Sequence, residues 1–349
     1  MRAEGLDAAA LCTTANFAWF TCGGSNYVGI ATETGAAAVV VTRQARYIVC
    51  DNIESRRIED EEVAGLGFKF RTCEWHEARK EDVIREIVGD GICGCDVPLD
   101  GARDLSAMLD ACRRSLTPPE IARYERLGQD VGECLAVTAR LIEPGMTEHQ
   151  IAAALDKRLR ERGIVPIVTL VAADERIERY RHPIPTDKKA GRCVMLVTGA
   201  RKWGLIVSAT RMVHFGPVSP ELRRKHDAVA RVDAELIAAT TVAARMGDIF
   251  ERGVAAYREV GFPDEWKLHH QGGPTGYKSR EFRVTRRTEQ RVAENQAFAW
   301  NPSITGTKTE DTIIATTLGP KIISLSGGWP VIEIDVGGRT VPRPDILER

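Results

Sequence analysis

The sequence lacks an excess of charge of either sign, and it lacks long apolar runs. Its 349 residues contain 48 Lys and Arg against 49 Asp and Glu, a formal net charge of −1. Nucleic-acid-binding domains usually carry a basic patch or stripe, so this balance indicates no nucleic-acid partner. The longest apolar run, 35–41, falls well short of the roughly 18 residues that a membrane helix needs. We therefore expect no membrane partner either.

The cysteines lack the spacing of a metal motif or a disulfide framework. There are nine of them, an odd number, and no two form a C-x-x-C pair. Cys93 and Cys95 are separated by a single residue, too close for the common zinc motifs. The first residues, 1–7, lack the basic and then apolar pattern of a secretory signal peptide. Free thiols in a reducing cytoplasm are the simplest interpretation, so we expect a cytoplasmic protein.

Composition and length are those of an ordinary globular protein with two domains. Hydrophobic residues make up 43% of the chain, which excludes a disordered chain, and domains average roughly 150 residues. A boundary signal lies at 115–120, where Thr117 suits a helix N-cap, Pro118 the first helical position and Glu120 the end of a capping box. We predict one domain over 1–114 and a second over 115–349.

The two predicted domains differ in their pattern of elements. In the first, strand-like runs such as 36–41 and 46–50 are followed by helical spacing at 81–88, which indicates a small α/β domain. The second reads as a helix pair, strands, a further helix pair and more strands. This order indicates two α+β halves of similar build.

Several motifs in the second predicted domain occur together in one protein family. They are Pro144-Gly145-Met146-Thr147-Glu148, His182-Pro183, Gly199-Ala200 followed by Ser208-Ala209-Thr210-Arg211, and Thr309-Glu310-Asp311-Thr312. With them, 115–349 resembles the pita-bread fold of the creatinase, aminopeptidase P and methionine aminopeptidase family. Residues 16–23 resemble a strand and turn of the creatinase-type N-terminal domain. The resemblance implies an α+β pita-bread domain that follows a smaller α/β domain.

Peptidases of this family hold two metal ions with two Asp, one His and two Glu side chains. The matching positions in our alignment are Thr198, Ala209, His270, Asn301 and Glu310. Three of the five ligands are therefore missing, and all three are carboxylates, which two dications need for charge balance.

One further histidine stands beside the retained one. Neighbours on a strand point to opposite faces, so His269 should not join His270 at one ion. Two ligands are fewer than the three that catalytic zinc usually takes from protein. The sequence therefore predicts no metal and no other cofactor.

The resemblance also assigns site residues. His182 aligns with a substrate-facing histidine and is suited to move a proton near neutral pH; the alternative is a histidine on a surface loop. Glu310 is expected to face the site and bind a cationic substrate nitrogen, or else to pair with Arg211. His270 is expected in the pocket, or as a buried structural histidine.

Further residues are expected to line the pocket. Tyr277 aligns near a second family histidine, where it would donate a hydrogen bond to an oxyanion, unless it is a structural tyrosine. Asn301, Thr198 and Arg211 complete the expected substrate-binding side chains. A basic run at 280–287 indicates a solvated face or, as the alternative, a clamp for a substrate carboxylate.

Creatinase is a member of this family that works without a metal. The resemblance thus implies a metal-independent hydrolase of an amide or guanidino-type C–N bond in a small molecule, with His182 as acid and base. The alternatives are a non-catalytic pita-bread binding protein and, more weakly, an Xaa-Pro aminopeptidase or dipeptidase with a non-standard metal site. Creatinase-like relatives dimerise through the N-terminal domain, so we expect a homodimer in which Trp19 and Phe20 help to close the neighbour's site.

Overall fold

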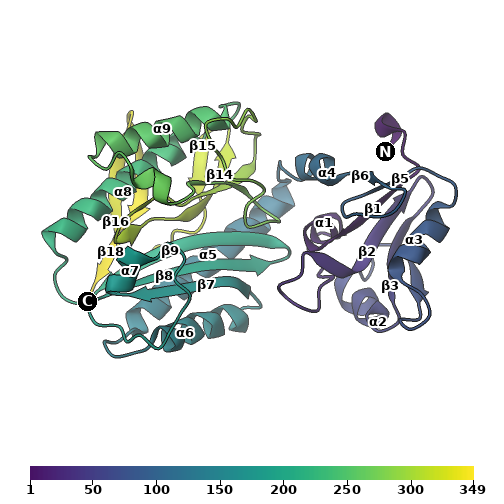
Figure 1. Cartoon of the computed structure of the whole chain (residues 1–349), viewed down its shortest axis with the longest axis horizontal. Coiled ribbons are helices and arrows are strands. Elements are labelled where there is room, and N and C mark those ends of the chain that lie inside the picture. The colour runs from purple at the N-terminus through teal and green to yellow at the C-terminus, as the bar shows by residue number, and fades with distance from the viewer. The chain divides into compact units, whose positions relative to one another are not determined.

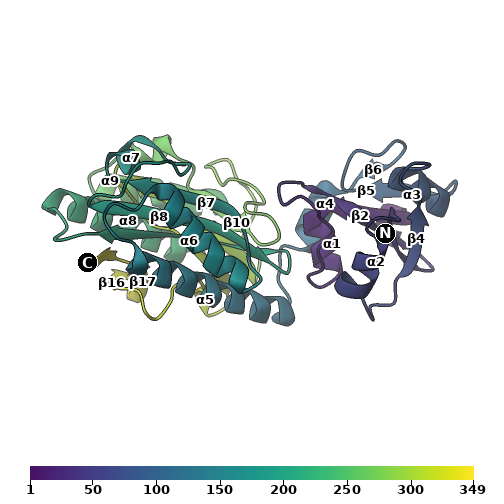
Figure 2. The same cartoon turned by 90° about the horizontal axis from the view of Figure 1, so that it is seen from below.

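The computed structural model describes all 349 residues, which form two compact units (Figures 1 and 2). Unit 1 contains Met1–Arg113 together with Trp203–Leu205, and unit 2 contains Arg114–Lys202 and Ile206–Arg349. The break along the chain thus falls directly before the capping box at Thr117. None of the helices combines the length and the apolar character that crossing a membrane requires.

Unit 1 is built on one sheet with the strand order β4-β3-β2-β1-β5-β6. Its strands are β1 (Ala8–Thr13), β2 (Thr34–Thr42), β3 (Arg46–Asp51), β4 (Lys69–Cys73), β5 (Cys93–Cys95) and β6 (Arg103–Asp104). Its helices are η1 (Arg2–Glu4), α1 (Thr14–Phe20), α2 (Ser55–Arg57), η2 (Ile58–Glu62), α3 (Lys80–Val88) and α4 (Ser106–Cys112). Both faces of the sheet are buried, because Ala9 and Leu11 join one core cluster while Ala8 and Ala10 join another. The predicted α/β class is confirmed.

One local prediction for unit 1 is wrong. The segment 16–23 was expected to be a strand and turn, but it lies in the helix α1 and the turn after it. Thr13 explains the difference, since its Oγ1 accepts a hydrogen bond from the backbone N–H of Asn16 at 3.3 Å and caps the helix. Asp96 in turn accepts from the Thr13 hydroxyl at 2.7 Å and fixes the cap.

Unit 2 contains two four-stranded sheets. The first, in the order β18-β9-β8-β7, consists of β7 (Val165–Ala173), β8 (Cys193–Lys202), β9 (Leu205–His214) and β18 (Ile346–Glu348). The second, in the order β10-β11-β14-β15, consists of β10 (Gly272–Thr275), β11 (Gln296–Trp300), β14 (Asp311–Thr316) and β15 (Gly319–Ile322). Two small pairs are β12 (Ser303–Ile304) with β13 (Thr307–Lys308) and β16 (Val331–Val336) with β17 (Arg339–Pro344).

Helices cover these sheets in two sets. They are α5 (Pro118–Leu141), α6 (Glu148–Glu161), α7 (Glu175–Arg179), α8 (Pro220–Ala239), α9 (Met246–Glu259) and η3 (Glu265–Leu268). The helix α6 packs on β7 and α5 on β8, whereas α8 packs on β16 and β17 and against α9, as Figures 1 and 2 show. This arrangement confirms the predicted pita-bread fold.

The helix start predicted at Thr117 is confirmed by its cap. The backbone N–H and the hydroxyl of Thr117 both donate to Glu120 Oε2, at 2.8 and 2.6 Å. Thr147 and Ser219 cap α6 and α8, accepting from backbone N–H groups at 3.2 and 3.3 Å. These caps were readable in the sequence because each satisfies helix N–H groups that have no partner within the helix.

The two sheets meet at a single isolated bridge between Thr210 on β9 and Glu310 at the start of β14. The N–H of Thr210 donates to the carbonyl of Glu310 at 3.0 Å. Ser208 and Thr312 continue the seam, because the N–H of Ser208 donates to the Thr312 hydroxyl and that hydroxyl donates back to the Ser208 carbonyl. Polar side chains of unit 2, among them Glu310, gather at this seam.

Candidate active site

Three histidines from two segments come together in unit 2. His182 lies on the loop after α7, and His269 and His270 lie between η3 and β10. The Nε2 atoms of His182 and His269 are 3.1 Å apart, and the ring centroids of His269 and His270 are 4.4 Å apart. One ring nitrogen from each of the three lies within 4.8 Å of the others. We call His182, His269 and His270 the histidine cluster.

The expectation that His269 and His270 point to opposite faces is wrong. Side chains alternate within a regular strand, but β10 begins only at Gly272. The backbone at Gly272 has φ +102°, and a Cβ there would meet the carbonyl oxygen of Ala299 at 2.2 Å. The chain therefore turns sharply as it enters the sheet, which leaves both histidines on one side.

All three histidines are held in the neutral form near pH 7. Burial, and then the positive charge of Lys308, lowers the pKa of His269 to about 3. Burial, and then Arg280, lowers the pKa of His270 to about 4. Partial burial and Lys308 also lower the pKa of His182, whose side chain is the most exposed of the three. A neutral imidazole carries one N–H donor and one free lone pair, so each ring can accept one proton.

Glu310 lies beside the histidine cluster with both carboxylate oxygens in use. Its Oε1 accepts from the Arg280 guanidinium at 2.9 Å, and its Oε2 accepts from Lys308 Nζ and the Thr210 hydroxyl, both at 2.8 Å. Only 2% of Glu310 is exposed. Burial alone would raise its pKa, but Lys308 and Arg280 outweigh that effect and lower the pKa of Glu310 to about 2.

Arg211 does not face this site, contrary to its predicted role in substrate binding. It is 1% exposed, and its guanidinium pairs with Asp311 at 2.9 Å rather than with the Glu310 carboxylate. Asp311 also binds Arg343 at 2.8 Å. Neighbouring residues on a strand face opposite sides, so Glu310 faces the cluster while Asp311 anchors a buried ion network behind it.

Ala209 also lies away from the site, although its position was aligned with a lost metal ligand. The side chains of β9 that face Glu310 and Arg280 are those of Thr210 and Ser208; Ser208 Oγ lies 3.4 Å from the Arg280 guanidinium. Ala209, between them, therefore points to the opposite face. The site-facing position is thus Ser208, one residue earlier, which is also without a carboxylate.

Thr198 is displaced in the same manner on β8. Its hydroxyl donates to the carbonyl of Val168 at 3.3 Å, which satisfies it within the sheet. Its neighbour Val197 shares an apolar cluster with Met195, and Met195 lines a pocket together with His269. The predicted role of Thr198 at the site is therefore wrong, and the residue on the site face, Val197, offers no oxygen ligand.

Tyr277 does not line the pocket as predicted. Asn301, in contrast, lies close to the histidine cluster. The Tyr277 hydroxyl donates to Glu120 Oε1 at 2.7 Å, in the cap of α5, and burial together with Glu120 raises its pKa. Its hydroxyl is therefore committed to the fold. The backbone N–H of Asn301 donates to the carbonyl of Gln271, next to His270, and its buried side-chain Oδ1 has no hydrogen-bond partner. Asn301 remains a candidate for binding.

Trp19 and Phe20 lie at the end of α1 in unit 1. Their rings meet edge to face at 6.4 Å, and Phe20 also lies 6.3 Å from Phe68. Both side chains are partly exposed. Their role in closing a neighbour's site stays a prediction.

The residues present do not fit the two-metal centre of the family. The site-facing positions Val197, Ser208 and Asn301 carry no anionic oxygen, and both oxygens of Glu310 are already bound by Lys308, Arg280 and Thr210. Lys308 and Arg280 are thus fixed on Glu310, the only one of the family's four carboxylate ligands that this chain retains.

Three residues at this site were not assigned to it from the sequence. Lys308 was missed, although residues two apart in an extended segment share a face, so its spacing from Glu310 was a usable signal. Arg280 was placed in a solvated basic run or a substrate clamp, but it binds Glu310 and is 15% exposed at its side chain. His269 was set aside on the alternation argument corrected above.

Two hollows of unit 2 differ in size and in their distance from the predicted site residues. A pocket beside the histidine cluster measures about 10 Å³, roughly the space of one water molecule. Its walls are Ile177, Tyr180, Arg181, Met195, His269, Ser303, Thr307 and Lys308.

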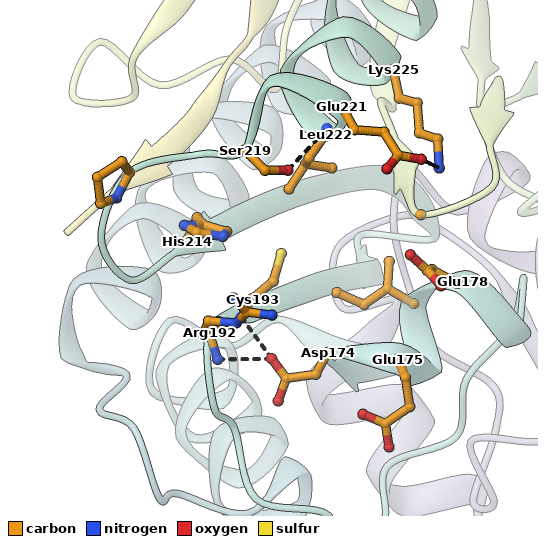
Figure 3. A pocket seen from close by; sticks show the side chains of 13 residues that line it. Asp174, Glu175, Glu178, Arg192, Cys193, His214, Ser219, Glu221, Leu222 and Lys225 are labelled. Carbon is orange, nitrogen blue, oxygen red and sulfur yellow. Dashed lines mark hydrogen bonds and ion pairs between the residues drawn. The ribbon is translucent and has the colours of Figure 1, made fainter.

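A larger cavity of about 390 Å³ lies between α7, the ends of β8 and β9 and the start of α8 (Figure 3). Much of the charge around it is compensated locally. Asp174 accepts from three backbone N–H groups, and Glu221 pairs with Lys225. None of the predicted site residues lines this cavity.

Two helix-covered sheets with a polar centre at their seam define the class of protein as a pita-bread domain of the metallopeptidase type. Residues 122–317, more than half of the chain, match metallopeptidase family M24, and the chain belongs to this family.

Related proteins support the same fold. An uncharacterized peptidase of Staphylococcus saprophyticus is 21% identical over 233 residues, which are 64% of this chain and 66%, just under two thirds, of that relative. The structure is similar to an Xaa-Pro dipeptidase from Bacillus anthracis, with TM-score 0.80, 17% identity and coverage of 100% and 96% of the two chains. It is also similar to a prolidase from Pyrococcus horikoshii, with TM-score 0.79, 16% identity and coverage of 93% and 95%.

Proposed function

We propose that this protein hydrolyses an amide or guanidino-type C–N bond of a small molecule in the manner of creatinase, without a metal ion in the reaction. The observation that carries the proposal is the environment of Glu310. Lys308 and Arg280 hold its two oxygens at 2.8 and 2.9 Å, where metallopeptidases of this family bind metal. Fixed side-chain cations replace mobile dications at this place.

In the proposed reaction His182 acts as the general base and then as the general acid. Its ring is neutral and is the most exposed of the cluster, and its Nε2 lies 3.1 Å from His269 Nε2. It takes a proton from the attacking water and returns one to the leaving nitrogen. His269 holds the ring of His182 in place through this contact, and His270 and Asn301 contribute polar groups nearby.

Lys308 and Arg280 supply the positive charge that the reaction requires. Negative charge develops on the scissile group as water attacks, and fixed cations in a dry site stabilise it without reorganisation. Glu310 therefore serves to hold these two cations, rather than to bind a substrate nitrogen as the sequence suggested. General acid and base catalysis contributes about 10²–10⁴-fold. No metal lowers the pKa of the attacking water here, so the substrate bond must be more reactive than an ordinary peptide.

The proposed protein is a cytoplasmic homodimer that acts on a small-molecule substrate. Peptidase activity, as in the names of the related proteins, is the competing hydrolase function. The uncharged side chains Val197, Ser208 and Asn301 count against its metal-dependent form, since no carboxylate stands at these positions.

A second candidate is a pita-bread protein that binds a partner and has no activity. The small volume of the pocket beside the histidine cluster, about 10 Å³, favours it, because a substrate needs more room than one water molecule.

The test is a turnover assay on chelator-treated protein. Creatine-like, N-acyl and Xaa-Pro compounds are incubated with enzyme whose metal content has been measured, with and without added Mn²⁺, Co²⁺ or Zn²⁺. Turnover of a creatine-like or N-acyl compound that persists without metal supports the proposal. Turnover only of Xaa-Pro compounds and only with metal would overturn it, and no turnover of any compound would favour the binding protein.

A further inference from the structure

The histidine cluster has the geometry of a ligand set for one ion. Zinc bonds to imidazole nitrogens at about 2.0–2.1 Å, so nitrogens around a tetrahedral ion lie about 3.4 Å apart. His182 Nε2 and His269 Nε2 are already 3.1 Å apart, and ligand nitrogens of all three rings lie within 4.8 Å of one another. The three rings are thus close enough for one nitrogen of each to reach a shared ion.

Two ring nitrogens of the cluster also lack a partner. Nδ1 of His269 and Nδ1 of His270 are buried and make no hydrogen bond. Buried polar atoms in folded proteins are nearly always paired, so these two nitrogens are available to a ligand, and either nitrogen of an imidazole can bind a metal ion.

The size of the adjoining pocket restricts the occupant. Its volume of about 10 Å³, with His269 in its wall, matches an ion or a single water molecule and no larger ligand. His182 is exposed, so solvent reaches at least one ring of the cluster.

The charges nearby restrict the type of ion. Lys308 and Arg280 carry positive charge close to the cluster, and the single carboxylate of Glu310 balances only one of them. Hard cations such as Mg²⁺ favour carboxylate oxygens, and both oxygens of Glu310 are already bound, whereas imidazole suits Zn²⁺, Cu²⁺ and Ni²⁺. The surplus positive charge lowers the affinity of the histidine cluster for a cation, compared with a site that is lined by carboxylates.

We infer that His182, His269 and His270 bind a single Zn²⁺ ion, and that this ion inhibits the protein by occupying the ring of His182. Only His270 stands at a ligand position of the family's two-metal centre, so this is a site of different composition and number. The inhibition rests on the function proposed above, but the binding does not. Three protein ligands leave a fourth position of the ion to water.

The test is a calorimetric titration of untagged, chelator-treated full-length protein with zinc chloride, with magnesium chloride as the comparison. We expect one Zn²⁺ per chain and no heat from Mg²⁺. His269→Gln should weaken zinc binding roughly tenfold or more, while His149→Gln, at an exposed position on α6, should leave it unchanged.

Cysteines provide the main competing zinc site. Cys12, Cys95 and Asp96 cluster in unit 1, with the two sulfur atoms 3.7 Å apart, so Cys12→Ser is titrated in parallel. Loss of zinc binding in Cys12→Ser but not in His269→Gln overturns the inference, as does an absence of zinc binding in the wild type. If His269→Gln fails to fold, His270→Gln and the visible spectrum of the Co²⁺-loaded wild type replace it, since tetrahedral nitrogen ligation and thiolate ligation give different spectra.

Activity separates this inference from the proposed function. Turnover that zinc stops at one equivalent supports both. Turnover that needs zinc would refute the metal-free reaction and zinc inhibition, yet leave the zinc site standing. Metal-free turnover by a protein that binds no zinc would support the proposed function and refute the zinc site.

Discussion

Lys308 Nζ lies 2.8 Å from Glu310 Oε2, and the two residues are 5% and 2% exposed. They are two positions apart in an extended segment, so their side chains share a face and meet without any backbone rearrangement. This pair occupies the seam between the two sheets of unit 2, and it sets the charge that surrounds the histidine cluster.

Replacing Lys308 with Met should destabilise the protein strongly. Removing the buried ammonium group takes away one of the two cations that hold Glu310 and costs roughly 3 kcal/mol in unfolding free energy. Arg280 still binds Glu310, and the double variant Lys308→Met/Glu310→Gln should not recover the loss, because it leaves the Arg280 guanidinium without its carboxylate. Chemical denaturation measures both effects.

The matched control for this substitution is Lys321→Met. Lys321 pairs with Glu125 at 2.6 Å, but its side chain is 56% exposed, so its loss should cost less than about 1 kcal/mol. Equal losses for the two lysines would contradict the structural role given to Lys308.

The fold was largely predictable because its signals are local. The capping boxes at Thr117 and Thr147 mark the first residues of α5 and α6. The motif at 309–312 contains Glu310, which forms the bridge between the two sheets. The site was predictable only in part. Side chains alternate between the two faces of a strand, so either Thr198 or Val197 faces the site, but not both. A one-residue error in aligning the motif therefore assigns every side chain of the strand to the wrong face. The convergence of His269 and His270 depends on a turn at Gly272, which no alternation rule describes.

Replacing His182 with Gln should lower the turnover number by about 10²–10⁴-fold and leave KM nearly unchanged. Gln keeps most of the volume and the hydrogen bonding of His, but it cannot carry a proton in the reaction. Because His182 is exposed on a loop, the melting temperature should hardly move. His149→Gln serves as the control. An unchanged turnover number would remove His182 from the mechanism.

Replacing Asp233 with Asn should change how stability depends on pH. Asp233 is fully buried beside Arg343 at 2.7 Å, and burial outweighs this pairing and raises its pKa to about 6. A raised pKa means that the folded state holds the proton more tightly than the unfolded state. The stability that Asp233 contributes is therefore present below about pH 4 and lost as the pH rises toward 6.

Asn has no proton to lose, so this loss should be absent in the variant. Between pH 3 and pH 7 the stability of Asp233→Asn should rise relative to wild type by roughly 3 kcal/mol, since each pKa unit is worth about 1.4 kcal/mol. Other groups, among them Glu310, titrate in both proteins and cancel in the difference. Denaturation curves at several pH values measure it, and a constant difference would refute the assignment.

Replacing Tyr277 with Phe should affect stability and spare catalysis. The hydroxyl donates to Glu120 Oε1 at 2.7 Å, and losing a buried hydrogen bond to a charged group costs roughly 1.5–3 kcal/mol. The turnover number should stay within about twofold of wild type, since the Tyr277 hydroxyl is committed to Glu120 in the cap of α5 and takes no part in the proposed proton transfers. A large loss of turnover in a stable variant would show that Tyr277 contributes to substrate binding or catalysis.

The last prediction concerns assembly. Sedimentation at micromolar concentration should show a dimer, and mixing two variants tests whether each site uses a neighbour's residues. His182→Gln lacks its own base, and Trp19→Ala lacks the side chain expected to close the partner's site. A mixed dimer then contains one site with both defects and one site with neither. Equal mixing should restore about one quarter of wild-type activity, because half of the dimers are mixed and each holds one intact site. A stable monomer, or a mixture no more active than its components, would show that the site is complete within one chain.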